Sequence, residues 1–223
     1  QEFISFSYSG ILIGNKLLSF SELVSLAYKE RVQLSALGFY KTPNIHWDRA
    51  KGKGEPFYYF SYGAAVSEVS LDTLTGEYIL NRTDILHDVG QTLNESIDIG
   101  QIEGGFIQGV GWLTSEELFW DDCGRLKTHA PSTYKIPLAS DTPETLNISL
   151  LKNSPNPRPT VKRSKAVGEP PFMLSISVFE ALSMAVSSVI DYSTCPNLST
   201  PATPENLLLT IEKLKRQNDA KRI

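Results

Sequence analysis

The chain has 223 residues, of which 41% are hydrophobic and 21% charged, so it can build one large domain or two small ones around a hydrophobic core. Its formal net charge is −4 and no segment carries a basic stripe, which argues against a nucleic-acid-binding protein. The two cysteines, Cys123 and Cys195, are too few for a disulfide framework and lack the spacing of a zinc or iron–sulfur site.

The N-terminal part predicts two short strands and one helix. Residues 3–8 alternate between apolar and polar side chains, and an apolar run at residues 11–13 follows after a Ser-Gly turn. Ser19 or Ser21 precedes an apolar-periodic segment that extends to Tyr28. Serine is a preferred N-cap residue, so we expect a helix to begin there.

The middle of the chain predicts a hairpin. Residues 57–71 are typical of a long strand, residues 72–76 contain turn-forming types, and residues 78–86 predict the returning strand. The first strand opens with the aromatic stretch 57–62, for which the simplest expectation is burial on both faces.

The C-terminal half predicts a glycine-rich helix at about residues 101–119, a strand at 147–151, a helix at 171–190 and a tail helix within about 201–217. Hairpins mixed with helices, without regular βαβ alternation, indicate an α+β fold with mixed or antiparallel sheets and packed helices. The helix at 171–190 approaches transmembrane length. Its serines and its helical spacing of apolar residues favour a buried or half-buried helix of a soluble protein instead.

Five glycines fall within twelve residues of the predicted glycine-rich helix, although each costs about 1 kcal/mol relative to alanine. Gly100 and Gly104 are four residues apart, as are Gly105 and Gly109, so each pair shares a helix face. The cause is either tight packing against another backbone or the approach of a bulky ligand such as a pterin or a phosphate. The spacing matches neither a dinucleotide fingerprint nor a P-loop.

Glu169 stands between a glycine and two prolines in the sequence SKAVGEPPF, residues 164–172. Pro170 disfavours the αR conformation for Glu169, which we therefore expect to be extended and outside the helix. Burial of its carboxyl group would raise its pKa and suit it to general-base catalysis near neutral pH. The alternative is a carboxylate that only caps the helix.

The three histidines, His46, His87 and His129, are scattered and lack the pairing of a helical metal site. We expect them to have structural or surface roles. No Ser-His-Asp or Cys-His arrangement can be assembled from the sequence.

The segment around Glu169 resembles the active-site signature of the molybdenum hydroxylases, the family of xanthine dehydrogenase and aldehyde oxidase. The resemblance covers nearly the whole chain from about Phe20. Further stretches are similar to xanthine dehydrogenase in the order in which that family has them: residues 34–48, 56–78, 82–109, 131–137 and 201–208. The resemblance implies that residues 1–223 are the C-terminal portion of a molybdopterin-binding domain.

The resemblance also implies a reaction, namely oxidation of hypoxanthine and xanthine to urate with water-derived oxygen. An aldehyde or another N-heterocycle is the alternative substrate. Glu169 corresponds to the general base, which takes a proton from a hydroxyl group on molybdenum, and Gln101 to a glutamine that hydrogen-bonds the pterin. The backbone run that passes the cofactor is implied to be Lys165, Ala166, Val167 and Gly168. No residue of this chain is expected to bind the metal directly.

The family builds its site from two halves, and the upstream cofactor loop and purine-orienting residues have no match here. FAD and 2Fe–2S clusters are implied on missing segments or a partner subunit. The expected partners are thus a small-molecule purine, the remainder of the molybdenum-binding subunit, the FAD and iron–sulfur domains, and a second copy in a homodimer. Neither nucleic acid nor membrane is expected. From the resemblance we also expect a cytoplasmic location and no activity of the isolated fragment. The rival hypothesis is a non-catalytic packing domain in which Glu169 only caps a helix.

Overall fold

The computed structural model describes residues 4–8 and 10–221. The chain divides into two compact units, Gln1–Pro56 and Phe57–Ile223, and each is described by itself. We call them unit 1 and unit 2.

Unit 1 contains a three-stranded antiparallel sheet, one helix and a small hairpin. Its elements are β1 (Ile4–Ser7), β2 (Gly10–Ile13), β3 (Lys16–Leu18), α1 (Phe20–Lys29), β4 (His46–Asp48) and β5 (Lys53–Glu55). Ser19 caps α1 in a capping box, because its hydroxyl accepts from the Glu22 amide while the Glu22 carboxylate accepts from the Ser19 amide. The predicted first two strands and the helix are confirmed, although residues 3 and 9 lie outside the described residues. The sequence did not indicate β3, β4 or β5.

Unit 2 is built on a sheet with the strand order β6-β7-β8. Strand β6 (Gly63–Leu71) pairs antiparallel with β7 (Tyr78–His87), and β8 (Thr145–Leu150) adds to β7 in parallel. The turn between the first two strands ends at Gly76, whose φ of +77° is accessible to glycine at little cost. The predicted hairpin and third strand are confirmed.

The aromatic stretch 57–62 is irregular rather than part of β6, and it is not buried on both faces, because Phe57 is 69% and Phe60 60% exposed. The prediction of a strand there is wrong. Its polar groups bond to residues 165–166 and, directly after β7, to the Asp88 amide. The Tyr59 hydroxyl accepts from the Ala166 amide, and the Phe60 carbonyl accepts from the Lys165 ammonium.

The α-helices in the described part of unit 2 are α2 (Glu95–Thr114), α3 (Pro170–Met173), α4 (Ile176–Ser188) and α5 (Pro204–Lys221), and the short 3-10 helices are Ala139–Asp141 and Val161–Arg163. Helix α2 begins six residues earlier than predicted because the Asn94 side chain accepts from the Ile97 amide and caps it. The single helix predicted at 171–190 is divided into α3 and α4, and α5 is longer than predicted.

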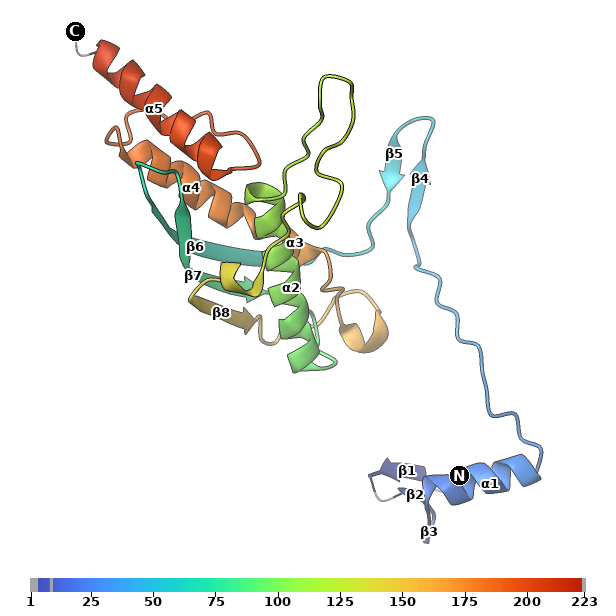
Figure 1. The fold of residues 1–223 in the computed structure, drawn as a ribbon. Coiled ribbons are helices and arrows are strands. Elements are labelled where there is room, and N and C mark those ends of the chain that lie inside the picture. The colour runs from blue at the N-terminus through green and yellow to red at the C-terminus, as the bar shows by residue number, and fades with distance from the viewer. Residues whose placement is uncertain (1–3, 9, 222–223) are drawn as a thin grey trace. The chain divides into compact units, whose positions relative to one another are not determined.

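The helices cover one face of the sheet. Along β7, Leu80, Thr83, Ile85 and His87 are buried. Helix α2 packs over β8, α4 packs over β6, and α5 lies on α4 (Figure 1). The core between them contains fully buried side chains from α2, α4 and α5: Ile102, Phe106, Val178, Leu182, Val186, Leu207 and Ile211.

Among the described residues, Pro170–Ser188 is the one helical stretch long and apolar enough to cross a membrane by length and composition. A core helix of a soluble protein passes the same test. The stretch is broken between α3 and α4, and Val178, Leu182 and Val186 are completely buried among the other core side chains. The expectation of a buried or half-buried helix is confirmed.

Candidate functional site

Glu169 is the N-cap residue of α3, and its side chain is exposed. Glu169 lies just outside α3, as predicted, but its backbone has φ −87° and ψ −35°, the αR conformation, so the prediction of an extended backbone is wrong. Its carbonyl accepts from the Phe172 amide at 3.0 Å, and Pro171 is buried. This hydrogen bond and the packing of the first turn outweigh the steric preference that Pro170 imposes.

The Glu169 carboxylate makes no capping hydrogen bond with any described residue. The helix-cap interpretation therefore lacks the geometry that it requires. Because the side chain is exposed, the residues of this chain do not supply the burial that the general-base interpretation expected. Burial of this carboxylate would require another part of the protein.

Two of the helix glycines allow α3 to approach α2 closely. A Cβ atom on Gly105 would lie 3.1 Å from the Gly168 carbonyl oxygen and 3.3 Å from Cβ of Pro171. One on Gly109 would lie 2.5 Å from the Phe172 carbonyl oxygen and would overlap the Ser175 hydroxyl. Tight packing against the α3 backbone therefore explains these two glycines. It is one of the two causes that the sequence predicted.

Packing within unit 2 does not account for Gly100 and Gly104. Both are exposed, and no described atom lies within 4 Å of a Cβ atom built on either of them. Gln101 is also exposed, and its Oε1 lies 4.0 Å from a Cβ position built on Gly168. The open face of α2 formed by Gly100, Gln101 and Gly104 therefore lies beside the turn that carries Glu169.

The segment that leads to Glu169 is tied to the rest of unit 2 by its first residues. The Lys165 amide donates to the Val89 carbonyl at 2.8 Å, and its ammonium forms an ion pair with Asp88. The Ala166 amide donates to the Tyr59 hydroxyl at 2.9 Å. The Lys165 side chain is thus engaged within the chain.

Val167 and Gly168 differ from Lys165 and Ala166 in their backbone amides. The Val167 side chain is in the core, with 9% of its surface exposed. Within the part of the chain that the structure describes, neither amide N–H has a recorded hydrogen-bond partner. The Gln101 carboxamide, two amides without a partner among the described residues and the residue that carries the Glu169 carboxylate therefore belong to the segments that meet at the junction of α2 and α3. This set can bind a polar heterocycle and exchange one proton.

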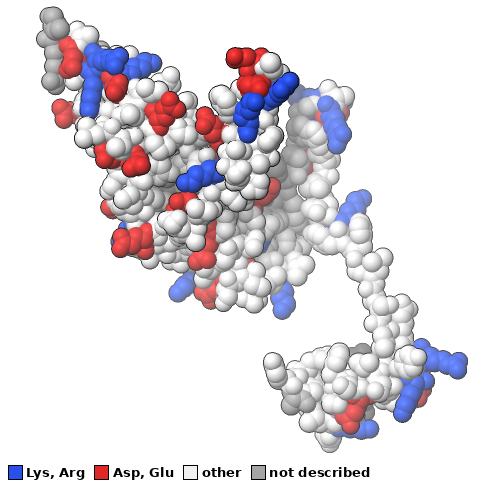
Figure 2. Space-filling view, viewed as in Figure 1, with Lys and Arg blue, Asp and Glu red and all other residues white. Residues whose placement is uncertain are grey.

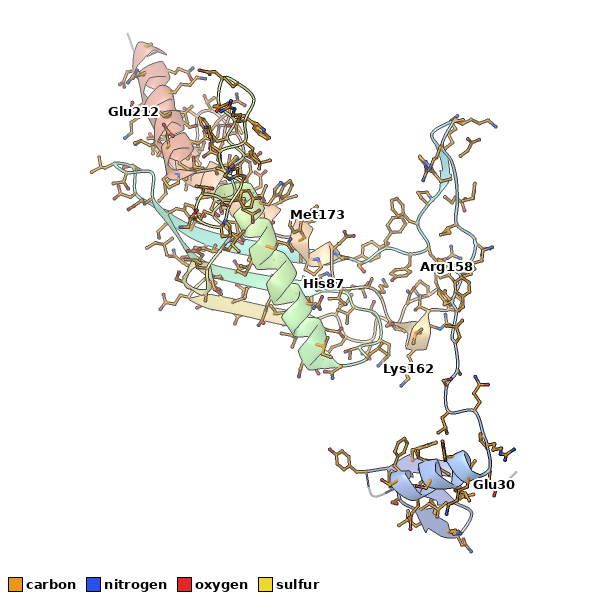
Figure 3. All side chains as sticks on the ribbon, turned by 45° about the vertical axis from the view of Figure 1, so that its right-hand side comes forward. Glu30, His87, Arg158, Lys162, Met173 and Glu212 are labelled. Carbon is orange, nitrogen blue, oxygen red and sulfur yellow. The ribbon has the colours of Figure 1, made fainter. Side chains whose placement is uncertain are left out.

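His87 is a buried residue whose environment the sequence did not predict. It is 1% exposed at the end of β7, and its Nδ1 has no hydrogen-bond partner among the described residues. Burial lowers the pKa of His87. Figure 3 shows His87 beside α2. The other two histidines, His46 and His129, are exposed. Over the described ranges, no group of three or more His, Cys, Asp or Glu side chains could hold a metal ion.

A cavity of about 1010 Å³ lies at the C-terminal end of α2, away from Gln101. None of the predicted site residues lines it. Its lining includes four carboxylates: Asp72, Glu77, Asp141 and Glu144. Burial raises the pKa of Tyr78 at this cavity. These carboxylates would repel an anionic ligand from the cavity. Over the visible face of unit 2 as a whole, acidic and basic side chains are mixed (Figure 2).

Comparison with known proteins gives matches of three kinds. A family model described as the molybdopterin cofactor-binding domain matches residues 3–143. Xanthine dehydrogenase of Oryza sativa subsp. japonica is 49% identical over 200 residues, which cover 85% of this chain and 14% of that protein. Among solved structures, quinoline 2-oxidoreductase from Pseudomonas putida 86 is 28% identical, with a TM-score of 0.58 over 65% of this chain and 18% of that one.

The aldehyde oxidoreductase from Desulfovibrio gigas is 25% identical, with a TM-score of 0.62 over 89% of this chain and 20% of that one. The chain spans only 14% of the length of the rice relative. The family-model match includes Gln101 but ends before Glu169.

Proposed function

This chain belongs to the molybdopterin cofactor-binding domain family, and on that premise we propose that it supplies one wall of the cofactor site in a molybdenum hydroxylase. The reaction is the oxidation of hypoxanthine and xanthine to urate with oxygen from water. The observation that carries the proposal is the junction of α2 and α3, where Gln101, Gly168 and Glu169 come together beside an open glycine face.

The residues at this junction fit the molybdenum–molybdopterin group. The Gln101 carboxamide can both donate to and accept from a pterin edge. Gly100 and Gly104 leave open space in which a bulky ring system can approach the helix backbone, and the amides of Val167 and Gly168 are available as donors. When bound, the group would supply the redox chemistry and the activated oxygen that side chains cannot provide.

Glu169 would act as the general base, taking one proton at its carboxylate during the reaction. Three features support this role rather than a capping role. The carboxylate makes no cap hydrogen bond to the described residues, the residue follows Gly168, whose backbone faces the Gln101 side chain, and the hydrogen bond from the Phe172 amide fixes the Glu169 backbone. The exposed carboxylate would lose water when the remainder of the subunit covers it.

The complete enzyme would contain further parts. The chain spans 14 or 15% of the length of its xanthine dehydrogenase relatives. The remainder of the molybdenum-binding subunit would close the site, while FAD and 2Fe–2S clusters would lie on other domains or on a partner subunit. We expect a homodimer in the cytoplasm.

A purine substrate is favoured over an aldehyde by the relative similarities. Identity is 49% to the rice xanthine dehydrogenase and 25% to the Desulfovibrio aldehyde oxidoreductase. Comparison of kcat/KM for xanthine, quinoline and an aliphatic aldehyde in the complete enzyme tests this preference. A higher value for the aldehyde would exclude the purine assignment and leave the family assignment intact.

The cofactor role of the junction can be tested by its metal content. Gln101→Leu in the complete enzyme should lower molybdenum retention after dialysis by about 10-fold or more, the range found when groups that support a metal centre are removed. The matched control is Gln217→Leu, since Gln217 is an exposed glutamine of α5. Full retention of molybdenum by Gln101→Leu would contradict the proposal.

A further inference from the structure

A buried ion pair lies four residues before Glu169. The Lys165 Nζ is 2.5 Å from the Asp88 Oδ2, and the two side chains are 4% and 1% exposed. The same Nζ donates to the Phe60 carbonyl at 2.9 Å. The partners are 77 residues apart in sequence. The pair therefore joins the end of β7, the irregular aromatic stretch and the segment before α3.

The charged atoms of the pair are well partnered. The Lys165 ammonium lies 5.2 Å from the centroid of the Tyr62 ring, within the range of a cation–π contact. The second oxygen of Asp88 accepts from the Gly90 amide at 2.9 Å. A buried polar network whose members are satisfied is rigid and specifies one geometry.

Stability alone does not explain such a pair. The cost of taking two charges out of water offsets much of their attraction, and apolar side chains of similar volume often stabilise a fold equally well. What the pair adds is direction, because each hydrogen bond fixes the ammonium against one acceptor. The pair can therefore fix the position of the backbone that follows Lys165.

That backbone leads directly to Glu169. The amides of Lys165 and Ala166 are bonded to Val89 and Tyr59, and the Val167 side chain is in the core. On the far side, Gly168 and the first turn of α3 rest against the glycines of α2. We propose that the Lys165–Asp88 pair is a positioning device, which holds the Gly168–Glu169 backbone so that the carboxylate faces the reacting group. This role rests on the proposed function of Glu169.

The test replaces the pair in the complete enzyme by apolar residues, Lys165→Met with Asp88→Leu, so that no unpaired charge is left buried. The matched control is Arg82→Met with Asp84→Leu, which removes an exposed ion pair of 2.6 Å on β7. Thermal unfolding and molybdenum content show whether each variant is folded and loaded. Two readouts follow: amide hydrogen exchange of residues 165 and 166, whose amides are hydrogen-bonded within the chain, and kcat per bound molybdenum.

Positioning predicts that the apolar pair variant folds and holds molybdenum like the wild type. Its amides at residues 165 and 166 should exchange at least about 10-fold faster, because the hydrogen bonds that hold this segment open more often. Its kcat per molybdenum should fall by about 10-fold or more, because misplacement of a catalytic group slows the chemical step. KM should change by less than about threefold. The control variant should match the wild type in every measurement.

Wild-type exchange, or wild-type kcat per molybdenum, in the apolar pair variant would overturn the proposal. A variant that fails to fold or to retain molybdenum would also overturn it, because the pair would then be a structural element. Hydrogen exchange separates this inference from the proposed function. Normal turnover by Glu169→Gln would exclude the base, whereas faster exchange in the pair variant would still show that the pair anchors the segment.

Discussion

The two kinds of glycine on α2 should respond oppositely to the same substitution, and the comparison tests the packing at the site. Gly109→Ala places a methyl group 2.5 Å from the Phe172 carbonyl oxygen and 2.9 Å from Cβ of Ser175. Gly104→Ala places it where no described atom lies within 4 Å. Both variants gain the same helix propensity, about 1 kcal/mol. The difference between them therefore isolates the close approach of α3.

The magnitude follows from the atoms that the new methyl group would meet. Overpacking of a well-packed contact costs about 1–3 kcal/mol. The upper part of this range applies, because the Phe172 carbonyl is backbone and cannot rotate away. Gly104→Ala should therefore stabilise the chain by up to about 1 kcal/mol, and Gly109→Ala should be about 2–3 kcal/mol less stable than Gly104→Ala.

Thermal unfolding followed by circular dichroism measures the difference. For a chain of this size, 1 kcal/mol corresponds to about 2–4 °C in Tm. Gly109→Ala should thus unfold roughly 4–12 °C below Gly104→Ala. Equal Tm values would show that α3 does not depend on the absence of a side chain at Gly109. In the complete enzyme, Gly104→Ala should instead lower molybdenum retention, because the methyl group would enter the proposed cofactor face.

Three further predictions follow from other parts of the chain. Ser19→Ala removes the hydroxyl of the capping box of α1 and should destabilise unit 1 by about 1 kcal/mol, measured by urea unfolding; no change would show that the cap contributes nothing. Burial lowers the pKa of His87 below 6.5, so the unfolded chain binds the proton more readily. The stability that neutral His87 confers is fully present above about pH 6.5 and is lost as the pH falls below it, and His87→Leu should flatten this dependence between pH 5 and 7.5. The isolated 223-residue chain, given xanthine and cofactor, should show no turnover, and measurable urate formation would contradict the requirement for the remaining subunit.

Local patterns in the sequence predicted much of the fold. The Ser19 cap, the turn before Gly76 and the alternation along β7 each rest on neighbouring residues, so sequence spacing was sufficient for them. Residues 57–62 were misassigned because their high β propensity competes with hydrogen bonds to residues more than 100 positions away.

The site shows the same distinction between local and long-range information. The residues around Glu169 singled it out, the family resemblance added Gln101, and the sequence offered two causes for the glycines. Only the structure assigns packing to Gly105 and Gly109 and leaves Gly100 and Gly104 open. It also shows the αR backbone of Glu169, which depends on packing of the first α3 turn against α2. The partner of Lys165 could not be predicted, because no local pattern connects it with Asp88.

The general-base role of Glu169 is tested most directly by single-turnover kinetics of Glu169→Gln in the complete enzyme, normalised to bound molybdenum. Glu180→Gln is the control, since Glu180 is an exposed glutamate of α4. Loss of the base predicts a rate of substrate oxidation at least about 100-fold below the wild type, with the control unaffected. A rate for Glu169→Gln within about threefold of the wild type would contradict the account, because general-base catalysis contributes far more than that.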